Sequence, residues 1–200
     1  MKIKAKYKIA RRLGEGLFDK TQTPKFALRR AQKGKSERPR PRSEFGLQLL
    51  EKQRARYYYG IGERQFKKYV REAIKTRGQT DLILYETLER RLDNVVYRLK
   101  FAPTRQAARQ MVSHGHIMIN GKKVNIPSFI VKAEDKVSIR PASMAKPLFR
   151  DLDEKIKGYM PPAWLSLNSE GKEAVVQGAP KLVRSELPFD LIPILEYYKR

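Results

Sequence analysis

The clearest chemistry in this sequence lies in arginine and amide side chains that recur at helical spacing near the middle of the chain. Arg91, Asn94 and Arg98 are three and four positions apart, a spacing that places side chains on one side of a helix. A guanidinium group holds phosphate through two parallel hydrogen bonds, and an amide fixes the register of a nucleotide. We therefore expect a helix over residues 91–99 that contacts nucleic acid, although a solvated basic face would have the same pattern.

A second helix is expected directly after the first. Pro103 ends the first helical pattern, and Thr104 is a suitable N-cap for the next one. Arg105, Arg109 and Ser113 then follow at four-residue spacing, which places them on one outer face. We expect this face, together with Thr104, to contact nucleic acid as well.

A β-hairpin is predicted after the second helix. Asn120 and Gly121 stand between two short apolar runs, and Asn-Gly is the strongest short signal for a two-residue hairpin turn. The turn is followed at once by Lys122 and Lys123, and His114 precedes the hairpin. These three side chains complete the predicted contact surface of the central segment.

The composition of the chain narrows the class of partner. Lysine and arginine outnumber aspartate and glutamate 44 to 21, which gives a formal net charge of +23 over 200 residues. A surface of that sign favours a polyanion. There is no cysteine, which excludes disulfides and thiolate zinc sites and fits a reducing cytosol. No apolar run approaches the length of a membrane span, and the spread of the charge makes membrane-surface binding the weaker alternative.

The central block resembles the RNA-binding module of the small-subunit ribosomal protein S4 family (uS4). The resemblance rests on residues 91–98 (RLDNVVYR), residues 105–116 (RQAARQMVSHGH) and the Asn-Gly turn. It continues through residues 8–14 (KIARRLG) and 50–66 (LEKQRARYYYGIGERQF), and it covers nearly the whole chain. Some family members hold the N-terminal segment with a cysteine-ligated zinc, so this chain resembles the bacterial or organellar type that lacks those cysteines.

The resemblance implies a function and a set of partners. The family binds small-subunit ribosomal RNA (16S-type) at a helix junction of the 5′ domain and nucleates assembly of the small subunit. It lies beside protein uS5 and other small-subunit proteins, near the channel through which messenger RNA enters. We accordingly expect a cytoplasmic, ribosome-bound protein that needs no cofactor and no metal.

The expected fold class is α+β, in three parts. They are an extended basic arm (residues 1–42), a helical domain (43–86, completed by a C-terminal helix at 186–200) and an S4-type RNA-binding domain with C-terminal strands (87–185). The arm has 15 basic against 3 acidic side chains, whereas the last quarter of the chain has 7 against 8. We therefore expect RNA on the arm and the central module, and protein contacts near the C-terminus.

In the arm, every second residue from Lys2 to Lys8 is lysine. An extended backbone would place these ammonium groups on one side, along a phosphate chain, although a solvated tail has the same composition. Arg11 and Arg12 are further RNA contacts in the family pattern. Residues 33–42 contain prolines that exclude a helix, so we interpret them as a basic strap on RNA.

Two helices are predicted in the helical domain, one from Ser43 as N-cap to about residue 57 and one from residue 63 to about 77. The first helix is expected to run through Phe45, Leu47, Leu49, Leu50 and Lys52. At least two of the three tyrosines at 57–59 are expected to pack in the helical core or against the arm and not to stack on bases. The predicted phosphate contacts of these helices are Lys52, Arg54, Arg56, Arg64 and Lys68.

Four segments after the hairpin are expected to be extended, namely residues 129–131, 136–140, 161–167 and 173–176. Trp164, in the third of them, is more typical of a packing anchor than of a base-stacking residue.

Three residues of the central segment, Asp93, His114 and His116, are of types that also occur in catalytic or metal sites. Asp93 stands in an Arg-Leu-Asp context that pseudouridine synthases also use, but it falls inside the amphipathic helix of the module. It is better explained as an ion-pair partner of Arg91 or Arg98. His114 and His116 lack further metal ligands at suitable spacing. We expect no enzymatic activity; the alternatives are an RNA-modifying enzyme that carries an S4 module, such as a pseudouridine synthase, or a non-specific RNA-binding factor.

Overall fold

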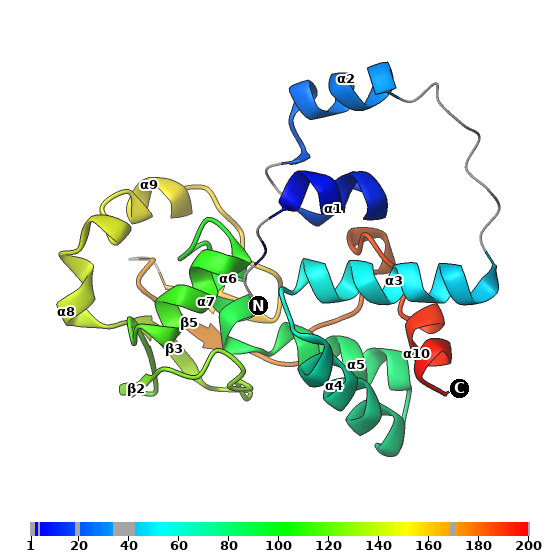
Figure 1. Cartoon of the computed structure of the whole chain (residues 1–200). Coiled ribbons are helices and arrows are strands. Elements are labelled where there is room, and N and C mark those ends of the chain that lie inside the picture. Colours follow the sequence, from blue (N-terminus) through cyan, green and yellow to red (C-terminus); the bar gives the residue numbers. More distant parts are fainter. Residues whose placement is uncertain (1–2, 4, 19–20, 34–42, 169–170, 200) are drawn as a thin grey trace. The chain divides into compact units, whose positions relative to one another are not determined.

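A computed structural model describes residues 3, 5–18, 21–33, 43–168 and 171–199 of the chain (Figure 1). It divides into two compact units, which are treated separately. Unit 1 comprises residues 1–84 and 183–200, and unit 2 comprises residues 85–182. The segment 1–42, which we expected as a separate arm, therefore falls in the same unit as the helical domain.

The described elements of unit 1 are helical. In chain order they are α1 (Lys6–Leu13), η1 (Glu15–Leu17), α2 (Pro24–Lys33), α3 (Glu44–Tyr58), α4 (Glu63–Lys75), the first half of α5 (Thr80–Glu89), η4 (Arg184–Glu186) and α10 (Ile192–Lys199).

The extended backbone predicted for residues 2–8 is wrong from Lys6 onward. Lys6 and Lys8 lie in helix α1, which buries Ala10 and Leu13. A helix turns successive side chains by about 100°, so lysines two apart no longer share a side. The proposed strap at residues 33–42 lies, apart from Lys33, outside the described residues.

Helix α3 begins as predicted, because the Ser43 hydroxyl accepts a hydrogen bond from the backbone N–H of Gly46 at 3.2 Å. The apolar side chains of its first turn are only partly buried. Phe45 and Leu47 are about half exposed, whereas Leu50 is buried. Phe45 is covered only in part, by a ring contact with Tyr197 of α10 at 5.5 Å between centroids.

Helix α10 is attached to α3 and α4 by a polar cluster around Glu63. Lys52, with only 6% of its side chain exposed, donates to the Glu63 carboxylate at 3.0 Å, and Arg56 donates to it at 2.8 Å. The Tyr198 hydroxyl donates to the same carboxylate at 2.7 Å. Burial raises the pKa of Glu63, but these hydrogen bonds and the Lys52 charge outweigh it, so the net pKa is lowered. The Lys52 ammonium also lies 4.5 Å from the centre of the Tyr197 ring.

Unit 2 is an α+β unit built on an antiparallel sheet. Its strands are β1 (Ile117–Ile119), β2 (Lys122–Val124), β3 (Lys136–Ile139), β4 (Leu165–Leu167) and β5 (Glu173–Val176), in the order β2-β1-β3-β5-β4. Its helices are the second half of α5, α6 (Leu92–Arg98), α7 (Arg105–Ser113), α8 (Pro141–Met144), the 3-10 turn η3 (Pro147–Phe149) and α9 (Leu152–Ile156).

The apolar side of α6 packs as its spacing predicts. Leu92, Val95, Val96 and Leu99 are fully buried in one cluster with residues of α7 and the sheet. Trp164 belongs to the same cluster and is 8% exposed, which confirms its packing role. A core of this kind holds the outer faces of α6 and α7 at a fixed distance from each other.

The β1–β2 hairpin has the predicted turn. Asn120 and Gly121 both have positive φ, at 49° and 76°, as a type I′ turn requires. The strand predicted at residues 129–131 is wrong, since only an isolated bridge joins Arg91 and Ile130. No helix in the described part of the chain is both long and apolar enough to cross a bilayer.

Candidate nucleic-acid interface

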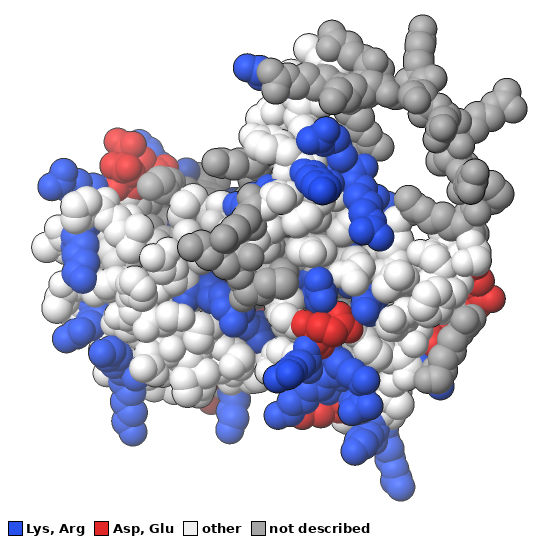
Figure 2. Space-filling view, viewed as in Figure 1, with Lys and Arg blue, Asp and Glu red and all other residues white. Residues whose placement is uncertain are grey.

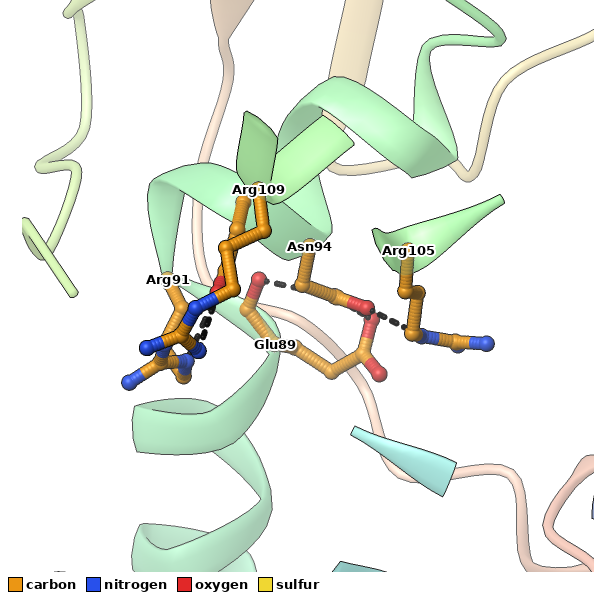
Figure 3. A network of polar contacts seen from close by, with 6 residues as sticks. Glu89, Arg91, Asn94, Arg105 and Arg109 are labelled. Atoms are coloured by element: carbon orange, nitrogen blue, oxygen red, sulfur yellow. Dashed lines mark hydrogen bonds and ion pairs between the residues drawn. The ribbon is translucent and has the colours of Figure 1, made fainter. Parts of the chain in front are cut away.

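Two buried carboxylates organise the polar side of α6 (Figure 3). The first is Asp93, which is 4% exposed. Arg91 donates to it through Nε at 3.0 Å and through Nη2 at 2.7 Å. Arg109 of α7 reaches the same carboxylate at 3.4 Å. Asp93 is therefore an ion-pair partner of Arg91, as one interpretation of the sequence had it.

The second carboxylate is Glu89, at the end of α5, which is fully buried. Arg98 donates to both of its oxygens, at 2.9 and 3.0 Å. The Asn94 amide donates to the Glu89 side chain at 3.0 Å and to its backbone carbonyl at 3.1 Å. Asn94 in turn accepts a hydrogen bond from Arg105 Nε at 2.9 Å, so that it links Glu89 to α7 (Figure 3).

The network separates the predicted contact residues into an inner and an outer group. Arg91 and Asn94 are 1% and 2% exposed, so their side chains do not reach the surface as the helical spacing suggested. Their burial follows from the two carboxylates, because a buried acid needs a cation or amide donor beside it. Arg98 keeps 19% and Arg109 keeps 37% of its side chain exposed, and Arg105 is partly exposed as well.

Two residues of this network were missed in the sequence analysis. One is Glu89, which shares helix α5 with the acidic residues Asp81 and Glu86, so nothing in the sequence set it apart. The other is Tyr97, whose ring lies under the Arg105 guanidinium at 4.3 Å. Arginine favours such stacking because its planar cation is weakly hydrated.

The remaining predicted residues of unit 2 lie around the end of α7 and on the hairpin. The Thr104 hydroxyl accepts from the Ala107 N–H at 3.2 Å and so caps α7. Ser113, His114, Lys122 and Lys123 are exposed.

His116 is buried, unlike its neighbour His114, and its Nδ1 lies 2.9 Å from the Ser143 hydroxyl. Burial and the positive charges of Lys146, His114 and Arg140 lower the pKa of its imidazole. Within the described residues, no three metal-ligating side chains come together.

In unit 1 the predicted residues again divide into exposed and internal ones. Arg11, Arg12, Arg64 and Lys68 are exposed. Lys52 is buried against Glu63, as described above. The guanidinium of Arg54 is bonded to Glu51 and to the Leu13 carbonyl, and that of Arg56 to Glu63.

Helix α4 carries a group of exposed cations. Five of its basic side chains and one glutamate line a shallow groove of about 420 Å³. The lining residues are Arg64, Lys67, Lys68, Arg71, Glu72 and Lys75. Figure 2 shows lysine and arginine side chains gathered over this helix. Lys68 is 3.7 Å from Glu72. The spacing of one cation per turn or closer suits a phosphate backbone.

Comparison with known proteins identifies the family. Residues 2–89 match the family model described as the ribosomal protein S4/S9 N-terminal domain, and residues 90–137 match the S4 domain. Small ribosomal subunit protein uS4 of Roseiflexus sp. (strain RS-1) is 44% identical over 197 residues, which cover 96% of both chains. The uS4 proteins of Chlorobaculum tepidum and Aquifex aeolicus are each 41% identical, over 96% of this chain and 96% and 95% of theirs. This chain belongs to the uS4 family of small ribosomal subunit proteins.

Proposed function

We propose that this chain is a structural component of the small ribosomal subunit that binds 16S-type RNA at the helix junction of the 5′ domain. In this proposal it nucleates assembly of the subunit and, beside uS5, forms part of the region through which messenger RNA enters. The observation that carries the proposal is the match to proteins named small ribosomal subunit protein uS4 over 96% of the chain. The charge of +23 supports a polyanionic partner.

The proposed contact surface consists of the exposed members of the predicted set and the three partly exposed arginines of unit 2. In unit 2 these are Arg98, Arg105, Arg109, Ser113, His114, Lys122 and Lys123. In unit 1 they are Arg11, Arg12, Arg64 and Lys68. The buried or internally bonded members, for which we propose a supporting role, are Lys52, Arg54, Arg56, Arg91, Asn94 and Thr104.

Recognition of RNA shape suits this surface better than recognition of base sequence. Arg98, Arg105 and Arg109 are each held by a side chain of unit 2 at a fixed distance. Cations that are fixed relative to one another fit one arrangement of phosphates better than others, and the A-form duplex offers side chains little access to its major groove. A junction of several helices supplies such a particular arrangement.

Asp93 has a structural part in this proposal and no catalytic one. Its carboxylate is 4% exposed and is engaged by Arg91 and Arg109. An aspartate in that position cannot approach a uridine without breaking a buried ion pair. The uS4 relatives are likewise structural, non-enzymatic constituents of the ribosome.

Chemical footprinting tests the proposal. The full chain, mixed with small-subunit 5′-domain RNA at physiological salt, should protect the backbone around the helix junction and leave distant helices accessible. Protection that rises evenly over all helices with protein concentration would contradict junction binding and would support a non-specific RNA-binding factor.

A further inference from the structure

We propose that Glu89 is a positioning residue for RNA recognition, which fixes Arg98 directly and Arg105 through Asn94. The inference rests on the proposed function, because it concerns the same surface of unit 2. It adds a residue that cannot itself contact phosphate, since Glu89 is negatively charged and fully buried.

The direct contact is the Glu89–Arg98 pair. Arg98 donates through Nε and Nη2 to the two carboxylate oxygens, at 2.9 and 3.0 Å. A bidentate pair of this kind fixes the plane of the guanidinium as well as its position. Since 19% of the Arg98 side chain is exposed, its outer part is presented in one orientation.

The indirect contact passes through Asn94. Its amide nitrogen is held by Glu89 at 3.0 Å, and this leaves its oxygen turned toward Arg105 Nε at 2.9 Å. The Arg105 guanidinium is held from a second direction by the Tyr97 ring, at 4.3 Å. One carboxylate therefore sets the distance between Arg98 of α6 and Arg105 of α7. Figure 3 shows the part of this chain of contacts that joins Asn94 to Arg105.

Electrostatics separates this role from a simple contribution to charge. A buried carboxylate beside a phosphate-binding surface weakens the attraction for any RNA, since like charges repel. If only net charge mattered, the loss of the Glu89 carboxylate would strengthen binding. If Glu89 positions the arginines, its loss weakens binding to the junction while binding to an ordinary duplex stays equal or becomes tighter.

Glu89→Gln tests this difference, because it removes the charge and keeps the shape of the side chain. Affinities of the full chain are measured for the 5′-domain junction and for a duplex of matched length. Glu173→Gln is the matched control, since it removes one carboxylate from strand β5 of the same unit. We expect Glu89→Gln to weaken junction binding about tenfold, within the range for loss of an arginine contact, and not to weaken duplex binding. Glu173→Gln should leave the preference for the junction unchanged.

A second variant guards against a folding defect. Asn94→Ala keeps both partners of the Glu89–Arg98 pair and changes no charge, but it removes the amide that connects Glu89 to Arg105. We expect a smaller loss, again confined to the junction, with the circular dichroism spectrum of the wild type. A misfolded protein would lose the wild-type dichroism spectrum, whatever its residual affinity for RNA.

Several results would overturn the inference. One is an unchanged ratio of junction to duplex affinity in both variants, with the wild type clearly preferring the junction. Another is equal weakening of both affinities in folded protein. A wild type without any preference for the junction would instead contradict the proposed function itself, so the two failures are distinguishable.

Discussion

Removal of Glu63 is predicted to destabilise unit 1 more than removal of its buried partner Lys52. Glu63→Ala leaves the Lys52 ammonium, with 6% of its side chain exposed, without its carboxylate. Loss of one partner of a buried ion pair costs about 3–5 kcal/mol. Because Glu63 itself is 40% exposed, solvent screens the pair, and we expect about 2–3 kcal/mol.

Lys52→Met keeps the aliphatic stem of the side chain and removes the charge. Glu63 then still accepts from Arg56 at 2.8 Å and from Tyr198 at 2.7 Å. We expect a cost of only about 1 kcal/mol, the typical value of one hydrogen bond to a partly exposed group. In the double variant no ammonium is left unpaired, so the two costs should not add, and the total should fall short of their sum by about 1 kcal/mol.

Urea unfolding of the two single variants and the double variant measures these free energies. Far-UV circular dichroism follows the helices of both units, while the fluorescence of Trp164, the single tryptophan, follows unit 2. The tryptophan signal should change little among the variants. Equal costs for Glu63→Ala and Lys52→Met, or fully additive costs, would refute the asymmetry and the buried ion pair behind it.

Three further predictions follow from unit 2. The double variant Arg105→Ala/Arg109→Ala should bind the junction more weakly, by about 1–3 kcal/mol per arginine, while its circular dichroism spectrum stays that of the wild type. An unchanged affinity would exclude these residues from the contact surface. Gly115→Ala should lower the free energy of unfolding by about 1 kcal/mol or more in a thermal melt, because Gly115 has φ +70°, a left-handed backbone conformation that strains any residue with a Cβ. The lowered pKa of His116 favours the neutral imidazole in the folded state. The contribution of His116 to stability is therefore complete above about pH 6.5 and is lost as the pH falls through the lowered pKa. His116→Gln should flatten this pH dependence of the free energy of unfolding, measured by urea titration at several pH values.

The elements of unit 2 that depend on local pattern could be predicted from the sequence. The apolar spacing of α6 and the N-cap Thr104 of α7 describe interactions within a few residues, and both are confirmed. The Asn120–Gly121 turn is local in the same sense, because positive φ is a property of those two residues. The apolar residues that α6 contributes to the core of unit 2 could therefore be predicted from the sequence.

The burial of Arg91 and Asn94 could not be predicted in the same way. Helical spacing places side chains on one face but does not say whether that face meets solvent or another polar group. Here the face is covered by Asp93, Glu89 and α7, and a carboxylate that folds back onto its own helix is not visible in a periodicity. Arg98 and Arg109, at the outer side of the network, have side chains that are partly exposed to solvent.

The error in unit 1 has a similar origin. Lys6 and Lys8 alternate as a strand would, yet the helix α1 forms because it buries Ala10 and Leu13. Tertiary packing prevailed over local pattern in this segment.

In the proposed function, the fixed cations of this chain recognise a particular RNA shape. The most direct test is the affinity of the full chain for the 5′-domain junction and for a length-matched duplex, measured across a salt series. We predict a preference for the junction of roughly a thousandfold at physiological salt, the lower end for specific over non-specific binding. Equal affinities with the same steep salt dependence would show that only the number of phosphates is recognised, and would contradict the claim.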